Sequence, residues 1–238
     1  QHLFAGTTAH YDHNGNLRTG YQVPSIVWSS FNKPLQISMA GHRYRFRYGP
    51  DRHRYYREEN GEISHYVGDN LERLNVGGID TWRHSVRIGG RVVAMNLLIG
   101  GEIETQYLHR DHLGSLTTVT DGESSEVLAR YSFDAWGQRR SPEDWTSDAK
   151  KVLHIRGYTG HEHLDEVGLI HMNGRLYSPR LGRMLSPDPV TQAPENPQNY
   201  NRYSYAMNNP LRYNDPSGYN FSDLLAEESG LQFWVGDR

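Results

Sequence analysis

Two Asp-Pro pairs are the residues of this sequence with the clearest capacity for acid–base chemistry. They are Asp188-Pro189 and Asp215-Pro216, 27 residues apart. Proline restricts the residue before it to extended backbone, which narrows the positions open to each carboxylate. Two carboxylates brought together in a water-poor interior cannot both ionise, so one can take a proton from water while the other polarises a carbonyl group. Taken alone, Asp215-Pro216-Ser217-Gly218 also has the residues of a type I turn, and a purely structural turn is the alternative.

The histidines offer a second kind of chemistry. The chain has 13 histidines and no cysteine, which excludes disulfides, thiolate zinc sites and a cysteine nucleophile. His161 and His163 alternate and could share one strand face, as metal ligands would. No third or fourth ligand follows at a recognisable spacing, so the sequence predicts neither a metal site nor a cofactor site.

A basic stretch over residues 42–57 raises the question of polyanion binding. Arg43, Arg45 and Arg47 alternate there with aromatic residues. A period of two is typical of a strand with one buried face and one wet face. The net charge of −3 gives no general attraction to nucleic acid, and no nucleic-acid partner is expected. We therefore expect these arginines to project into solvent or into an enclosed polar space, with polyanion binding as the alternative.

Short turn motifs divide the chain into many strands. Asn14-Gly15, Asn60-Gly61 and Asp121-Gly122 are strong hairpin signals, because asparagine, aspartate and glycine adopt the turn conformations that join antiparallel strands. Helical patterning occurs only over residues 142–151 and 222–229. The sequence predicts an all-β chain of antiparallel hairpin repeats that stack on one another to bury their faces.

The composition indicates a thin or hollow architecture, or a fragment that packs against missing neighbours. Hydrophobic residues make up 36% of the chain and the mean hydropathy is −0.78. No apolar run approaches the roughly 20 residues that a membrane-spanning helix needs. Residues 186–219 are rich in Pro, Asn and Tyr, which predicts an irregular layer held by Tyr200, Tyr203, Tyr205 and Tyr213.

A series of longer motifs follows the turns in a fixed order. After Tyr11-Asp12 and Gly15-Asn16 come Asp111-His112-Leu113-Gly114-Ser115, Phe133-Asp134-Ala135-Trp136-Gly137, Tyr158-Thr159-Gly160-His161-Glu162, Asn173-Gly174-Arg175-Leu176-Tyr177, Ser186-Pro187-Asp188-Pro189, Asn201-Arg202-Tyr203-Ser204-Tyr205 and Asp215-Pro216-Ser217-Gly218. This series resembles the C-terminal core of Rhs (rearrangement hotspot) and YD-repeat proteins. The resemblance is dense over residues 107–219 and loose over residues 1–106.

The resemblance implies a long β-sheet strip that coils into a hollow shell, or cocoon, around a toxic C-terminal domain. It divides the chain into a YD-repeat β-shell (1–157), an irregular Pro/Tyr-rich core with an autoproteolysis motif (158–219) and a tail after the expected cut (220–238). The implied partners are the rest of the shell, a C-terminal toxin domain and a secretion-apparatus or toxin-complex subunit. The implied context is a secreted effector, delivered by a bacterial type VI secretion system or within an insecticidal toxin complex.

The resemblance also implies an enzymatic activity, self-cleavage in cis. Family members end this core in Pro-x-x-x-x-Asp-Pro-x-Gly-Leu and are cut once after the Leu by an aspartic-protease-like reaction. The motif runs from Pro210 to Gly218 in this chain, and Tyr219 stands in place of the leucine. The resemblance therefore makes Tyr219–Asn220 the expected scissile bond.

The same resemblance assigns roles to four residues. Asp188 and Asp215 are the expected catalytic pair. Arg175 or Arg183 could steady a developing oxyanion or tune the pair, and an ion pair in the shell wall is the alternative. Two other functions stay open: a non-cleaving structural or extracellular YD-repeat protein, and a sugar- or surface-binding protein that uses exposed aromatic residues.

Overall fold

The computed structural model describes residues 2–4, 7–20, 22–76, 78–146, 153–191 and 196–223. These residues form antiparallel strands and short 3-10 helices, with no α-helix among them. The predicted all-β antiparallel fold is therefore confirmed.

A strip of eleven strands makes up most of the structure. Each strand pairs with the next one along the chain, as expected when short turns join alternating segments. The strands are β4 (Ser25–Trp28), β5 (Pro34–Met39), β6 (His42–Tyr48), β7 (Arg54–Glu59), β8 (Glu62–Val67), β9 (Leu71–Val76), β10 (Ile79–Ile88), β11 (Arg91–Ile99), β12 (Glu102–Arg110), β13 (Leu116–Asp121) and β14 (Val127–Arg130).

The three predicted hairpins lie where the turn motifs place them. Asn14-Gly15 lies between β2 (Thr7–Tyr11) and β3 (Leu17–Thr19), Asn60-Gly61 joins β7 to β8, and Asp121-Gly122 lies at the turn from β13 to β14. Asn60 and Gly61 both have positive φ angles, which is why this dipeptide suits the turn. Strand β1 (His2–Phe4) completes a three-stranded sheet with β2 and β3.

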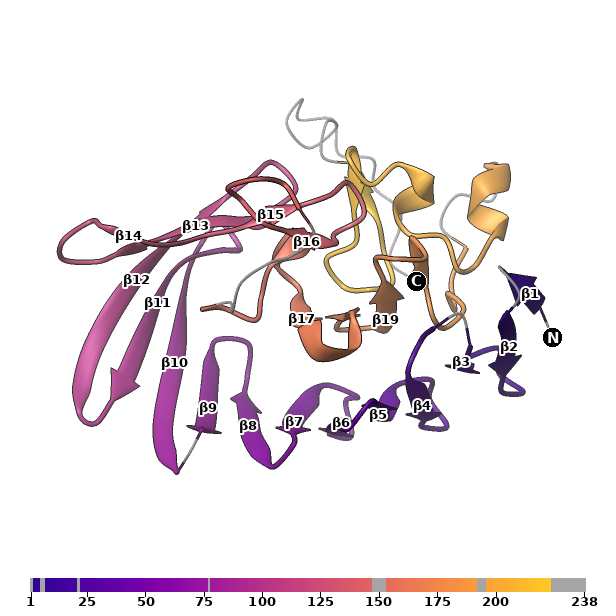
Figure 1. Ribbon diagram of the computed structural model, residues 1–238, viewed down its shortest axis with the longest axis horizontal. Coiled ribbons are helices and arrows are strands. Elements are labelled where there is room, and N and C mark those ends of the chain that lie inside the picture. Colours follow the sequence, from indigo (N-terminus) through magenta and orange to yellow (C-terminus); the bar gives the residue numbers. More distant parts are fainter. Residues whose placement is uncertain are drawn as a thin grey trace.

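The strip curves around a smaller four-stranded sheet (Figure 1). That inner sheet contains β17 (Glu162–Leu164), β18 (Leu169–Met172), β19 (Arg175–Ser178) and β20 (Arg183–Met184). The remaining elements are β15 (Ser132–Phe133), β16 (Arg139–Arg140), β21 (Tyr213–Asn214), β22 (Ser222–Asp223), and the 3-10 helices η1 (Tyr158–Gly160), η2 (Asp165–Val167), η3 (Pro197–Tyr200) and η4 (Ala206–Asn208). Every residue of β17, β18 and β19 is buried, so this sheet fills the concave side of the strip.

One hydrophobic cluster joins the strip to the inner sheet. Ile26, Ile37 and Phe46 of the strip pack in the same cluster as Leu164 and Leu176 of the inner sheet. The predicted boundary between residues 157 and 158 remains a prediction, but residues on its two sides share this core.

A buried charged group also connects the two parts. The carboxylate of Glu162 pairs with Arg54 and with Arg57, whose Nε lies 3.3 Å from Oε1, and the Tyr66 hydroxyl donates to Oε2 at 2.9 Å. We call these four residues the Glu162 cluster. The arginines hold the pKa of Glu162 well below its usual range, against a burial effect that would raise it.

The arginine side chains of residues 42–57 lie on both faces of the strip. Arg43, Arg45 and Arg47 are exposed on β6, which confirms the predicted wet face. Arg45 pairs with Glu58, and Arg47 lies over the ring of Tyr56. Arg54 and Arg57 instead point inward into the Glu162 cluster, which the sequence did not indicate.

The Pro/Tyr-rich segment is irregular, as predicted, but its tyrosines differ in role. Tyr205 is fully buried against Tyr158 and Tyr177, Tyr203 donates to the Gly15 carbonyl at 2.7 Å, and Tyr213 packs against the same buried cluster as Tyr205. Tyr200 is 66% exposed, so its ring lies mostly outside the core.

The two expected helical segments fall largely outside the described residues. Residues 142–144 form a turn, residues 145–146 are irregular, and residues 222–223 are the strand β22, which corrects the start of each predicted helix. The remaining residues of both segments lie outside the described part of the chain. Within the described residues, no helix has the length and apolar character needed to cross a membrane.

Candidate functional site

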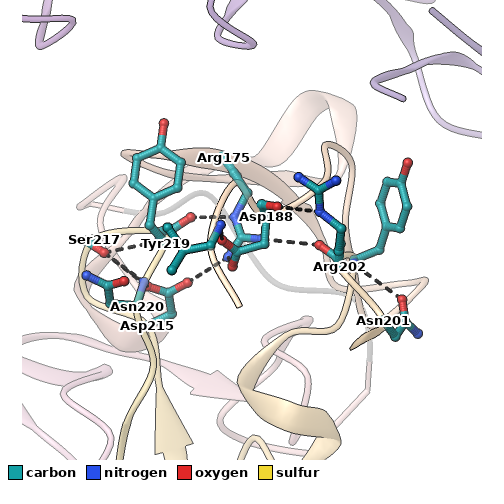
Figure 2. Close-up of polar contacts among 11 residues, drawn as sticks. Arg175, Asp188, Asn201, Arg202, Asp215, Ser217, Tyr219 and Asn220 are labelled. Carbon is teal, nitrogen blue, oxygen red and sulfur yellow. Dashed lines mark hydrogen bonds and ion pairs between the residues drawn. The ribbon is translucent and has the colours of Figure 1, made fainter. Parts of the chain in front are cut away.

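The two predicted aspartates meet at one arginine. Asp188 follows β20, Asp215 follows β21, and Arg175 begins β19. The Nη2 atom of Arg175 lies 2.9 Å from Oδ2 of Asp188 and 3.1 Å from Oδ2 of Asp215 (Figure 2). The fold therefore brings both carboxylates to a single guanidinium nitrogen.

Arg175 is buried in the inner sheet and binds the backbone beside the predicted cut. Its side chain is only 3% exposed. Besides the two carboxylates, it binds the carbonyl oxygen of Gly218 through Nε. A buried guanidinium needs several acceptors, and here they are two carboxylates and the carbonyls of Gly218 and Arg202, so Arg175 fixes the positions of Asp188, Asp215 and Gly218 together.

Asp215 closes a tight turn and also contacts the predicted scissile bond. The Gly218 N–H points to the Asp215 carbonyl at 3.4 Å, and the Ser217 hydroxyl lies 3.3 Å from Oδ1. The backbone N–H of Asn220 donates to Oδ1 of Asp215 at 2.9 Å and to the Ser217 hydroxyl at 3.0 Å. The turn predicted from the motif is present, and its first carboxylate lies at the nitrogen of the Tyr219–Asn220 bond.

Two glycines allow this segment to approach the inner sheet. Gly218 has a φ of +77°, and a Cβ atom there would lie 1.9 Å from the Met172 carbonyl oxygen. A Cβ on Gly174 would lie 2.7 Å from both the Ser217 carbonyl oxygen and the Tyr219 ring. Only glycine fits at these positions, so the motif glycines set how closely residues 217–219 lie against the sheet.

Two hydrogen bonds with Arg202 hold the backbone of Asp188. Its N–H donates to the Arg202 carbonyl at 2.8 Å, and Arg202 Nε donates back to the Asp188 carbonyl at 2.6 Å. Burial raises the pKa of Asp188 above its ordinary value, Arg175 acts in the opposite direction, and the nearby Asp215 raises it further. The raised pKa favours the protonated form of Asp188.

A small cavity adjoins both carboxylates. Its volume is about 20 Å³, and its lining includes Arg175, Asp188, Asp215, Tyr219 and Phe221. That volume is enough for a water molecule, which needs about 10–15 Å³ measured in this way. The site thus has room for one water molecule beside two carboxyl groups.

The sequence also raised Arg183 as a partner of the two aspartates and His161 with His163 as metal ligands. Arg183 is exposed on β20 and forms no ion pair with either aspartate among the described residues. His161 is buried: its Nε2 donates to the Pro216 carbonyl at 3.2 Å, and its Nδ1 lies 2.8 Å from the Thr159 hydroxyl. In the described ranges, no group of three potential ligands is arranged to hold a metal.

Sequence reasoning missed one residue that contacts this segment. Lys33 lies just before β5, and its Nζ lies 5.2 Å from the centre of the Tyr219 ring. Two of its partners, Asn173 and Tyr219, follow it by 140 residues or more in the chain, so no local pattern could indicate these contacts.

Comparisons with known proteins connect this chain to large shell proteins and toxins. The family described as the teneurin YD-shell matches residues 97–211. The tRNA3(Ser)-specific nuclease WapA of Bacillus spizizenii is 29% identical over 215 residues, which are 88% of this chain and 9% of WapA. The toxin protein Tse5 of Pseudomonas aeruginosa is 31% identical over 125 residues, which are 50% of this chain and 8% of Tse5.

A solved structure has the same fold. The Photorhabdus luminescens Tc holotoxin pore matches with a TM-score of 0.70 and 21% identity, over 88% of this chain and 10% of that chain. Identity at this level supports likeness of fold alone. The chain spans about a tenth or less of the length of each of these proteins.

Proposed function

This chain belongs to the Rhs/YD-shell family, and from that premise we propose that it is the C-terminal part of a toxin shell that encloses an effector and frees it by cutting its own chain after Tyr219. The single observation that carries the proposal is the position of Asp215. Its carboxylate contacts the nitrogen of the Tyr219–Asn220 bond and shares Arg175 with Asp188.

The two aspartates have different roles in the proposed reaction. Asp188, whose pKa is raised mainly by burial, holds a proton and polarises the Tyr219 carbonyl. Asp215 takes a proton from a water in the adjoining cavity, and the hydroxide attacks the carbonyl carbon. As the C–N bond breaks, Asp215 gives that proton to the Asn220 nitrogen, 2.9 Å away. The products are a carboxyl group on Tyr219 and an amino group on Asn220.

Arg175 positions the two acids and lowers the energy of negative charge in the site. Its Nε binds the carbonyl of Gly218, one residue before the carbonyl of the proposed cut. This contact would polarise the carbonyl of Gly218 rather than that of Tyr219. A cut between Gly218 and Tyr219, one residue earlier, is therefore the competing cleavage position. The position of Asp215 at the Asn220 nitrogen favours the cut after Tyr219.

The proposals of an enclosed effector and of a delivery apparatus rest on the relatives rather than on contacts within this segment. Tse5 is named as a toxin, and the Tc structure is a holotoxin pore, which favours a secreted or delivered assembly with further shell and toxin parts. Type VI secretion and an insecticidal toxin complex are both proposed contexts. The nuclease activity in the name of WapA is not assigned to this chain, which spans 9% of that protein.

Intact-mass measurement of the purified chain tests the proposal. A cut after Tyr219 gives fragments 1–219 and 220–238, and the competing cut differs by the mass of one tyrosine residue. The Asp215→Asn chain is the uncut reference, because asparagine keeps the shape of the side chain but cannot exchange the proton. A wild-type chain that stays whole after prolonged incubation, with no fragment from either cleavage position, would favour the non-cleaving YD-repeat alternative.

A further inference from the structure

Lys33 is a buried ammonium without an acidic partner among the described residues. It is 7% exposed, and its Nζ donates one hydrogen bond, to the Asn173 carbonyl at 2.9 Å. Burial, with Arg54 and Arg52, lowers the pKa of Lys33 to about 8, so most of the lysine is charged at neutral pH. A buried cation without a carboxylate needs another source of negative potential.

Two aromatic rings supply that potential. The Lys33 Nζ lies 5.2 Å from the centre of the Tyr219 ring and 6.0 Å from that of Tyr48. A cation within about 6 Å of a ring centre is attracted by the negative face of the ring. The turn before β5 holds the lysine in place, because the Lys33 N–H donates to the Ser29 hydroxyl at 3.0 Å.

The half-buried Tyr219 ring is contacted by residues from both halves of the chain. Gly174 lies so close that an added Cβ would meet ring atoms at 2.7 and 2.8 Å. The Arg175 guanidinium lies 5.9 Å from the ring centre, on the same chain segment as Gly174. Lys33 comes from the strip, whereas Gly174 and Arg175 come from the inner sheet.

We propose that Lys33, Gly174 and Arg175 form a binding subsite for the side chain of residue 219, and that Lys33 makes this subsite selective for an aromatic ring. The inference rests on the proposed function insofar as residue 219 carries the carbonyl group to be cut. The subsite accounts for Tyr219 where the family has leucine: a cationic subsite favours an aromatic ring, whereas leucine offers no π face. A comparison with the family motif alone would predict the reverse, that leucine is the better residue here.

A double-mutant cycle in an uncut chain tests the contact without requiring cleavage. In an Asp188→Asn background, Lys33→Met and Tyr219→Leu are measured singly and together by urea unfolding. We expect the two effects to be non-additive, by a factor of about 2 to 30 in the folding equilibrium constant. Tyr219→Phe is the matched control: it keeps the ring, so Lys33→Met should have the same effect in the Tyr219→Phe chain as in the chain with Tyr219. Additive effects of Lys33→Met and Tyr219→Leu would overturn the subsite.

Cleavage rates then test selectivity, with intact mass as the readout. In chains with both aspartates, Lys33→Met should slow the cut of the Tyr219 chain by about 2- to 30-fold and leave the rate of the Tyr219→Leu chain unchanged. Equal slowing of both chains would overturn the claim that Lys33 selects the ring. Coupling in unfolding without cleavage in any chain would reject the proposed function while the binding subsite stands.

Discussion

The backbone N–H of Asn220 donates a 2.9 Å hydrogen bond to Oδ1 of Asp215. Peptide hydrolysis must place a proton on the leaving nitrogen, and a carboxyl group 2.9 Å from that nitrogen is near enough to supply it once the attacked nitrogen has become pyramidal. The contact also has a structural use, because it closes the segment from Asp215 to Asn220. Substitution at Asp215 should therefore affect both chemistry and stability.

The first prediction concerns the catalytic pair. Asp188→Asn and Asp215→Asn should each reduce the rate of self-cleavage by about 10²- to 10⁴-fold, since each removes one acid–base group. The measurement is the fraction of cut chain against time by intact mass. Asp51→Asn is the control, because that carboxylate is mostly exposed and its partner among the described residues is His53. Unchanged cutting in Asp188→Asn would show that Asp188 is only an ion-pair partner of Arg175.

The second prediction concerns the close approach at Gly218. Gly218→Ala should lower the free energy of unfolding by more than the 1 kcal/mol or so expected for alanine at positive φ, because its Cβ would lie 1.9 Å from the Met172 carbonyl oxygen. Gly168→Ala is a matched control, with a φ of +63° and no atom within 4 Å of an added Cβ. Chemical denaturation of both variants gives the comparison. Equal losses would mean that residues 217–219 move away from the inner sheet at little cost.

The third prediction concerns the Glu162 cluster. Glu162→Gln should lower the free energy of unfolding by about 3–5 kcal/mol, because it leaves the buried guanidinium group of Arg54 without a carboxylate and that of Arg57 with Glu59 alone. Glu166→Gln, four residues later on the same segment and 56% exposed, should change stability by less than about 0.5 kcal/mol. A small effect at Glu162 would indicate that water reaches the cluster and solvates the arginines.

The fourth prediction concerns acid. Burial lowers the pKa of His154 to about 4, with Arg83 and Arg110 acting in the same direction, whereas the unfolded residue has a pKa of about 6.5. A lowered folded pKa gives stability that is full above pH 6.5 and is lost as the pH falls toward 4. Within that window, His154 alone should contribute a slope of up to about 1.4 kcal/mol per pH unit.

The variant His154→Gln should flatten this dependence. Glutamine can keep a hydrogen bond to Gln106, which His154 contacts at 2.8 Å. His161 and His163, whose pKa values burial also lowers to about 4, should retain their part of the slope. Urea midpoints between pH 4.5 and 7.5 measure the effect, with the exposed His13→Gln as control. An unchanged slope in His154→Gln would mean that His154 is protonated in the folded chain.

The strands of the strip could be predicted from neighbouring residues, whereas contacts between distant segments of the chain could not. Asn60-Gly61 determines its own hairpin, and Arg43, Arg45 and Arg47 follow the period of one strand, so both could be inferred from neighbouring residues. Arg54 and Arg57 lie in the same basic stretch but bind Glu162, more than 100 residues later. Nothing in their own neighbourhood distinguishes them from the exposed arginines.

The candidate site shows the same limit. The motif order identified Asp188, Asp215 and Arg175, which the fold brings into direct contact. Arg183 was a candidate from the same resemblance but is exposed on β20, because one strand sends alternate side chains to opposite faces. Lys33 has no motif, and only the curvature of the strip brings it to Tyr219.

The contacts between the strip and residues 158–219 also set an order of events during folding. Glu162 binds Arg54 across 108 residues, Lys33 binds Asn173 across 140, and Tyr203 binds Gly15 across 188. Contacts of such high sequence separation form late, because the intervening loop must be closed first. During synthesis the strip leaves the ribosome before the segment that would cut the chain. A cut that Lys33 and Arg175 promote at Tyr219 would therefore be slow until the strip has packed against residues 158–219, and self-cleavage would report that this packing is complete.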